Sequence, residues 1–514
     1  MKYLGSLILL TLSVGVWAQT PADSIYSSKP TDSVYRYRST QNLLKAIDLS
    51  MPQLLNHEVE KSTKVGLEYN YIKGGFRQAQ QAELDRTAKF AAEGISTLDR
   101  FKLYGSFEFH RNWQDSLAFS QKGIEDRFSP YYFIAQKAGV FERQTYKGKG
   151  LVAYELIPKK WYLGTAIDYL YHTSNRSVDP RSSVTTYQFK VIPQITYSTG
   201  AHNIGVGLRY GYGDETVGIA YKNDDFQGTL LFPDRISYLN FGYGYLEINQ
   251  TNFRRKFNSS GFELNYAGML ADWNTTTKLS YSIDKTENLY ETSNSIRDNV
   301  FGDFQLETVS ADVQLYKKLS ITSHLIGLHF DQQVGDDNLR RLAARNFTYE
   351  ASNLNLDYVL AKYNALDQVA HEYNFQLMYH STYQRDAAAN HTLEFSYLQP
   401  QLGFSKYWKS GFIGSLDLGA RIPLNNDVRV PFTQENLFTK GVVYPDYMYW
   451  ASQVGMVQVA VKYRTDKLIP KFNSELAFQT AYLSNLSSPE VNFVPTFVPA
   501  KQRLNLNIGF NLYF

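Results

Sequence analysis

The chain ends in the stretch RLNLNIGFNLYF, residues 503–514. Every second residue of this stretch is apolar or aromatic, namely Leu504, Leu506, Ile508, Phe510, Leu512 and Phe514. The residues between them, from Arg503 to Asn511, are arginine, asparagine or glycine. Because successive side chains of a β-strand point to opposite faces, the stretch predicts a strand with one apolar and one polar face.

The same alternation recurs along most of the chain. In residues 204–212, Ile, Val, Leu and Tyr alternate with Gly and Arg, and in 457–464 Val and Tyr alternate with Gln, Ala, Lys and Arg. Tight turns alternate with long polar loops between these segments. The turns are predicted near Asp99, Pro158-Lys159-Lys160, Gly200, Asp272-Trp273-Asn274, Lys317-Lys318, Asn364, Ser410-Gly411 and Asp466, and the long loops at 112–146, 214–260 and 423–448.

A soluble β-sandwich would show the same alternation and is the alternative. Two features favour a membrane protein. The strands are at least as long as the roughly 9–11 residues of a tilted membrane strand, and short turns on one side oppose long loops on the other. The sequence therefore predicts an all-β fold over residues 65–514, a transmembrane, antiparallel, up-and-down β-barrel. About 18 strands are expected, with 16 to 20 open, and an even number leaves both termini periplasmic.

The composition agrees with this prediction and excludes other classes. The chain has 40 Tyr and 32 Phe, although only 43% of its residues are hydrophobic. A barrel needs such rings where its wall meets the membrane surfaces. The net charge of +3 suggests no nucleic-acid partner. Without cysteine there are no disulfides and no thiol chemistry.

The N-terminus predicts export. Lys2 precedes an apolar run from Leu4 to Val16, and Val16-Trp17-Ala18 forms a small-residue cleavage site. This pattern predicts a signal peptide at residues 1–18, with a short buried helix as the alternative. Residues 19–64 are polar with a helix-like stretch around Leu43 to Leu55. They are expected to form a periplasmic segment, either a small hatch that enters the barrel or a flexible leader.

The pattern as a whole resembles outer-membrane β-barrel families of unknown function from Bacteroidetes-type bacteria. The most recognisable part is Tyr169–Gly213, an alternating strand followed by Asp179-Pro180-Arg181 and a hairpin at Gly200. The terminal Phe514 resembles the C-terminal signal of outer-membrane barrels. The resemblance implies location in the cell outer membrane and recognition of Phe514 by the barrel assembly machinery. It implies no substrate.

One short stretch suggests enzyme chemistry. His172-Thr173-Ser174-Asn175 resembles the His-x-Ser-Asn stretch of outer-membrane phospholipase A, in which His activates a nucleophilic Ser. The position of the orienting Asn of that family is Thr186 here. By strand parity His172 and Ser174 also face the lumen, away from lipid. A polar strand end is the preferred interpretation.

No catalytic, cofactor-binding or metal-binding residue is predicted. Zinc-binding, phosphate-binding and serine-hydrolase motifs do not occur in the sequence. His329 and Asp331 lie on one strand face, but two ligands are weak support for a metal site. The protein is therefore expected not to be an enzyme, and no cofactor is expected.

Charges of both signs are predicted to face the lumen. Strand parity selects Glu68, Lys102, Glu108, Glu155, Asp168, Lys190, Arg209, Glu263, Lys278, Asp312, Asp357, Glu372, Glu394, Asp417, Arg421, Lys462, Glu475 and Arg503. The mixture shows no ion selectivity. The leading function is a channel or porin-like transporter that passes small solutes across the outer membrane, with lipid and small solutes as partners. The alternatives are a non-conducting barrel that displays loops for binding or envelope assembly, and a lipolytic enzyme.

Overall fold

The computed structural model describes residues 49–57, 59–227, 230–291 and 299–514. Eighteen strands form its main sheet. Their bounds are β1 Lys61–Lys73, β2 Leu84–Leu98, β3 Phe101–Leu117, β5 Gly139–Ile157, β6 Trp161–Arg176, β7 Arg181–Ser198, β8 His202–Ala220, β11 Phe253–Leu270, β12 Trp273–Tyr290, β13 Asn299–Lys318, β14 Thr322–Leu339, β15 Phe347–Tyr363, β16 Val369–Asp386, β17 His391–Tyr407, β18 Phe412–Arg429, β19 Gln453–Ile469, β20 Phe472–Ser487 and β21 Gln502–Tyr513. Within the described ranges, no helix is long and apolar enough to span a membrane.

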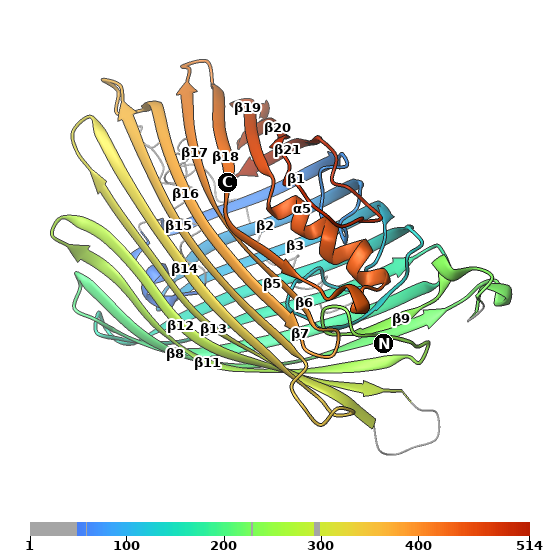
Figure 1. Ribbon diagram of the computed structural model, residues 1–514. Coiled ribbons are helices and arrows are strands. Elements are labelled where there is room, and N and C mark those ends of the chain that lie inside the picture. The colour runs from blue at the N-terminus through green and yellow to red at the C-terminus, as the bar shows by residue number, and fades with distance from the viewer. Residues whose placement is uncertain (1–48, 58, 228–229, 292–298) are drawn as a thin grey trace.

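The sheet is closed into a barrel. Each of these strands pairs antiparallel with the next one, and the last strand returns to the first. β1 and β21 pair from Lys64 opposite Tyr513 to Lys73 opposite Leu504. Figure 1 shows the long, tilted strands that surround a common interior. The predicted all-β antiparallel barrel is confirmed, as is the count of about 18 strands.

The two ends of the barrel have different connections. At the turn end, strands are joined by short connections such as 99–100, 199–201, 271–272 and 470–471, and β1 begins and β21 ends there. At the loop end, the connections 118–138, 221–252 and 430–452 are long. The predicted alternation of turns and loops is thus present. The first strand begins at Lys61 rather than at Val65, where the barrel was expected to start.

Several predicted boundaries are wrong. β19 continues past Asp466 to Ile469, so the turn lies at 470–471. Its pairing with β20 is irregular between Thr465 and Ile469. The alternation of the sequence is interrupted at this irregularity, and such an interruption suggests a turn. The connections 118–138 and 221–252 are shorter than predicted because the adjoining strands extend further, and the third lies at 430–452 rather than at 423–448.

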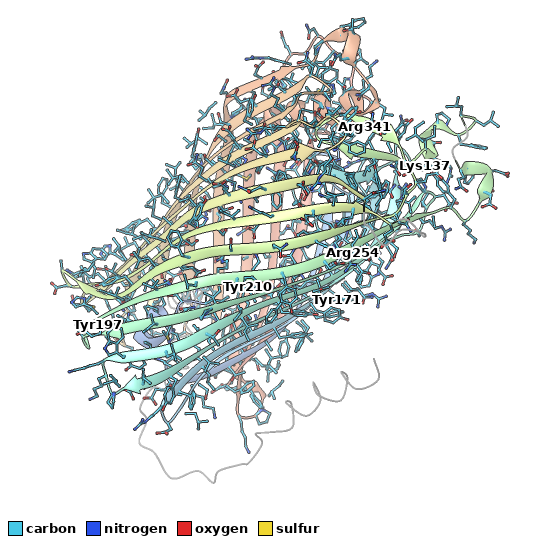
Figure 2. The ribbon with its side chains drawn as sticks, turned by 90° about the horizontal axis from the view of Figure 1, so that it is seen from below. Lys137, Tyr171, Tyr197, Tyr210, Arg254 and Arg341 are labelled. Atoms are coloured by element: carbon cyan, nitrogen blue, oxygen red, sulfur yellow. The ribbon has the colours of Figure 1, made fainter. Side chains whose placement is uncertain are left out.

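The two faces of the wall differ in polarity. On the outer face of β8, Leu208 is 62% and Tyr210 is 60% exposed, whereas Glu263 on the inner face of neighbouring β11 is fully buried. Figure 2 shows Tyr197 near one end of the wall, Tyr210 along its length, and Arg254 toward the other end. An exposed apolar outer face is the property that a lipid-facing barrel requires.

Parts of three loop-end connections fold into the barrel. The first contains β4 Tyr131–Ile134, and the second contains β9 Tyr238–Phe241, β10 Leu246–Ile248 and the 3-10 turns η1 Asp224–Phe226 and η2 Pro233–Arg235. β4, β9 and β10 form a separate three-stranded sheet. The third contains the 3-10 turn η3 Phe432–Gln434, a π-helix η4 Thr439–Val443 and α5 Tyr444–Trp450. At the opposite end, α4 Met51–Asn56 lies against the inside of the wall.

Candidate functional site: the barrel lumen

A hydrophobic core fills the lumen at the loop end. We call its inward-folded parts, residues 118–135, 236–246 and 436–450, the plug. Their apolar side chains pack against rings on the inner face of the wall. The fully or nearly fully buried members are Tyr131, Phe133, Ile134, Leu239, Phe241, Phe438, Val442 and Trp450 of the plug and Phe253, Phe301, Phe304, Phe347 and Phe395 of the wall. Such a core obstructs the passage of solute at this end.

Buried hydrogen bonds fix the plug to the wall. Asp386 Oδ2 accepts from the backbone N–H groups of Tyr243 and Tyr245, at 2.7 and 2.8 Å. The Tyr131 hydroxyl donates to Asp337 at 2.8 Å. Asn346 donates to the carbonyl of Phe241 at 2.8 Å. Because buried polar groups are costly when unpaired, these bonds favour one position of the plug.

Aromatic stacking anchors α5. The rings of Trp450 and Phe395 are 4.5 Å apart and almost parallel, with an interplanar angle of 2°. Arg127 lies 4.5 Å above the Trp450 ring, and Arg421 lies 4.4 Å from that of Tyr449. Cation–π contacts of this kind strengthen when they are shielded from water. α5 is therefore held from both the wall and the first plug loop.

Asp446 of α5 is a buried carboxyl group. Its Oδ1 accepts from the N–H of Ala79, in the β1–β2 connection, at 2.8 Å. Burial raises the pKa of Asp446 to about 6, and the hydrogen bond from Ala79 together with Arg127 and Arg77 opposes that rise. The group therefore changes charge near physiological pH.

Beside α5, the pairing between β18 and β19 ends before β18 does. β18 pairs with β19 only as far as Arg421 opposite Val454, although β18 continues to Arg429. Residues 430–452 leave the wall at this point and fold inward. In Figure 1, α5 lies beside β18, beyond the end of β19. The third plug segment, residues 436–450, therefore enters the lumen beside the part of β18 that extends past its pairing with β19.

At the turn end, α4 occupies one side of the lumen. Met51 and Leu54 pack against Leu151 and Ile192. The side chain of Gln194 holds the start of the helix. Its Oε1 accepts from Met51 N at 2.9 Å, and its Nε2 donates to the backbone carbonyl of Leu49. Burial and nearby Lys102 lower the pKa of His57, just after the helix, to about 4. Residues 19–48 of the predicted hatch lie outside the described residues, so the hatch stays a prediction.

Between α4 and the plug the lumen contains accessible charges. The side chains of Asp312 and His329 are 46% and 41% exposed on the inner face. Other charges are buried in pairs, such as Arg464 with Glu475 at 2.6 Å. Glu263 lies between Arg209 at 2.7 Å and Lys278 at 3.7 Å. The lumen charges predicted by parity thus fall into two groups. Some form buried ion pairs within the wall, and others are accessible from the lumen.

The residues considered for enzyme chemistry lie inside the barrel. The two ring nitrogens of His172 contact the Thr145 hydroxyl at 2.8 Å and the Gly123 carbonyl at 2.9 Å. Ser174 is fully buried, and Thr186 donates to Glu215 at 2.7 Å. His172 is thus engaged with the plug loop rather than with Ser174. That the protein is not an enzyme stays a prediction.

The residues considered for metal binding are engaged with each other. His329 Nδ1 lies 2.5 Å from Asp312 and Nε2 lies 3.2 Å from Asp331. Both ring nitrogens therefore face carboxylates and leave no nitrogen for a metal. In the part of the chain that the structure describes, no group of three or more His, Cys, Asp or Glu side chains could hold a metal ion.

These features define a closed β-barrel whose lumen is obstructed by its own loops. The chain belongs to the DUF6850 family, a family of unknown function, whose model matches residues 52–514. This match confirms the expected membership of a family of unknown function, while origin in Bacteroidetes stays a prediction. No curated protein matches the chain.

Solved structures with a similar fold are distant in sequence. The FrpB iron transporter of Neisseria meningitidis is 9% identical with a TM-score of 0.41, covering 91% of this chain and 83% of that one. The ferric preacinetobactin receptor BauA of Acinetobacter baumannii is 10% identical with a TM-score of 0.39, covering 88% and 80%. OpdK of Pseudomonas aeruginosa, solved with vanillate, is 10% identical with a TM-score of 0.37, covering 88% and 99%.

Proposed function

We propose that the protein lies in the outer membrane, with its termini on the periplasmic side, and is a gated route for small solutes. The observation that carries this proposal is an 18-stranded lumen obstructed by loops rather than by the wall. A barrel of this size encloses an aqueous channel unless something fills it. The filling segments are connections between strands, so they can move while every strand pair remains intact.

The exposed charges between plug and α4 support a water-filled interior. The side chains of Lys89 and Glu108 are 28% and 35% exposed although they face inward, and those of His329 and Asp312 are more exposed still. A lumen designed only for packing would bury such groups in pairs. The structure thus resembles the closed state of a channel with polar walls.

Conductance in planar bilayers tests this function. The mature chain is compared with a variant in which residues 432–450 are replaced by a short Gly-Ser linker, which removes η3, η4 and α5 and keeps every strand. We expect low conductance for the intact chain and a stable, larger conductance for the variant. The matched control shortens the exposed turn 365–367, which lies between β15 and β16 at the end opposite the plug, and should behave as the intact chain. Absence of conductance in the plug variant, with the protein correctly folded, would refute the proposal.

A second candidate function is binding at the loop end without conduction. A cleft of about 920 Å³ lies at the rim, between side chains such as Arg385 and Glu394, the end of β18, and residues 490–493. The prediction that Glu394 faces the lumen is wrong, because its neighbours Leu393 and Phe395 point into the interior core and Glu394 lies on the opposite face. Its many polar groups suit a hydrophilic partner outside the cell. This candidate predicts that neither the intact chain nor the plug variant conducts.

A further inference from the structure

A second, smaller cavity lies within the lumen. Its volume is about 320 Å³, within the range of cavities that hold small ligands. Plug residues 121–132 line one side. The inner face of the wall, including Lys190, Ser259 and Phe304, lines the other. A ligand here would contact the plug and the wall at once.

Four wall positions of the cavity region form one row. Lys190 of β7 lies opposite Gly211 of β8, Gly211 opposite Ser259 of β11, and Ser259 opposite Asp284 of β12. Neighbouring strands are about 4.8 Å apart, so Lys190 and Ser259 are separated by about 10 Å at the backbone. A long lysine side chain can cover most of that distance.

Gly211 leaves room for the Lys190 side chain to lie along the wall. A Cβ atom at Gly211 would be 2.8 Å from Lys190 Cγ and 3.2 Å from Ser259 Cβ. The lysine therefore extends across the glycine toward the serine. Lys190 and Ser259 thus flank Gly211 and line the same cavity.

Polar groups in the cavity lack partners. Gln121 of the plug is 1% exposed, and neither its amide oxygen nor its amide nitrogen has a hydrogen-bond partner in the described part of the chain. The same holds for the hydroxyl of Ser259, a residue that is 7% exposed. Buried amides and hydroxyls are normally paired, so these two groups are available for hydrogen bonds with a ligand in the cavity.

The carboxylates closest to the plug side are already neutralised. Asp126 pairs with Lys122 at 3.2 Å, and Glu215 pairs with Arg255 at 2.8 Å. For Lys190, by contrast, no carboxylate lies within ion-pair distance among the residues that the structure places. Asp168 of β6 lies opposite Lys190 in the strand register, but the two form no ion pair in the described part of the chain. The Lys190 ammonium group is therefore available to an anionic ligand.

The remaining lining is largely apolar. Phe128 of the plug and Phe304 of the wall stack with an interplanar angle of 6°, and Phe257 and Leu306 extend the surface. Asp284 occupies the far end of the row, beyond Ser259. A second negative charge on the ligand would meet this carboxylate, which disfavours dianions.

We propose that this cavity binds a small organic monocarboxylate with an apolar body. The carboxylate contacts Lys190 and Ser259, Gln121 contacts a polar atom from the plug side, and the apolar body lies against the phenyl rings. The inference rests on the proposed function in one respect: it takes the solute of the proposed channel to be such an acid, which contacts the plug when it is bound.

Calorimetric titration of the purified full chain in detergent tests the site. The probe is 3-phenylpropionate, compared with its neutral amide, with the dianion phenylsuccinate and with zwitterionic phenylalanine. We expect 3-phenylpropionate to bind more tightly than the other three. Equal binding of the amide refutes the role of charge, and preferential binding of phenylalanine or phenylsuccinate refutes the monocarboxylate class.

Variants locate the binding. Lys190→Met should weaken binding about tenfold, since a charge-assisted contact is lost, and Lys190→Arg should restore most of it. Gln121→Leu should weaken binding without loss of folding, because its side-chain amide makes no hydrogen bond within the described part of the chain. Lys147→Met is the matched control, an inward lysine of β5 outside the cavity. Equal affinities for the intact chain and Lys190→Met would overturn the proposal.

The two proposals can fail separately. A plug variant that conducts, together with an intact chain that binds none of the probes, refutes the ligand site and leaves the channel. Binding that depends on Lys190, together with a plug variant that does not conduct, refutes the channel and leaves the site.

Discussion

Glu263 illustrates how single residues stabilise the inside of the wall. Its carboxylate is fully buried between Arg209 and Lys278, on the strands to either side. Removal of the charge in Glu263→Gln takes the buried carboxylate away from Arg209 and Lys278, and breaking such a buried pair costs about 3–5 kcal/mol. We expect a loss of unfolding free energy of this size, measured by urea unfolding in detergent.

The control for this change is an exposed pair with the same geometry. Arg111 and Glu142 are also 2.7 Å apart, but their side chains are 45% and 42% exposed. Glu142→Gln should cost less than about 1 kcal/mol, because exposed ion pairs contribute little. If both variants lost the same stability, burial would not be the reason for the effect.

Asp446 predicts a pH dependence of the plug. Its pKa of about 6 in the folded protein lies above the ordinary value of 3.8, so the folded plug binds the proton more tightly than the unfolded one. This contribution to stability is complete below about pH 4 and is lost as pH rises through about 6. Conductance of the intact chain should therefore fall when the pH is lowered from about 7.5 to about 5.

The variant Asp446→Asn imitates the protonated carboxyl group. It should give low conductance at both pH values, because the plug no longer carries a buried charge. If this variant kept the full pH dependence of the intact chain, another titrating group would be responsible.

Strand parity predicted the direction of lumen residues but not their partners. Lys190 and Glu263 were assigned to the inner face from the alternation alone, and they line the lumen. Glu263 is paired with Arg209 and Lys278 of the two adjacent strands, and such partners are not contained in the parity of one strand. For the same reason, Ser259 and Gln121 could not be recognised as part of a site.

At the scale of elements, the stack on Trp450 is the main contact that holds α5. Trp450→Ala removes a nearly fully buried ring that contacts Phe395 and Arg127. Loss of such a ring costs roughly 3–5 kcal/mol. We expect the plug to open more often and the conductance to rise, measured by single-channel recording.

Trp408→Ala is the matched control for Trp450→Ala. Trp408 is 46% exposed in the turn between β17 and β18, at the end opposite the plug. Its loss should leave the conductance unchanged. An equal rise in both variants would indicate general loosening of the barrel rather than release of α5.

The strands could be predicted from the sequence, whereas the folding of the loops could not. Alternation is a local pattern, so it can be recognised in the sequence without knowledge of the fold. The contacts of the plug are distant in sequence, as in the bond between Tyr131 and Asp337. A signal was nonetheless present: the runs YYFI at 131–134 and VVYPDYMYW at 442–450 are too apolar for loops in water.

At the scale of the whole molecule, the asymmetry of the two ends supports the proposed orientation in the membrane. The first strand begins and the last strand ends at the turn end, and long connections occur only at the loop end within the described residues. In outer-membrane barrels, short turns face the periplasm and long loops face outward. The exposed Arg341 and Lys137 lie toward the loop end in Figure 2.

This orientation predicts which sites are accessible on intact cells. An epitope inserted in the exposed loop 341–344 should be labelled by an external antibody, because it would project from the loop end. The same epitope in the turn 364–368, between β15 and β16, should be labelled only after the outer membrane is permeabilised. Labelling of the turn alone on intact cells would reverse the orientation and place the plug on the periplasmic side. The plug would then respond to periplasmic pH and solutes rather than to those outside the cell, so the direction of gating depends on this measurement.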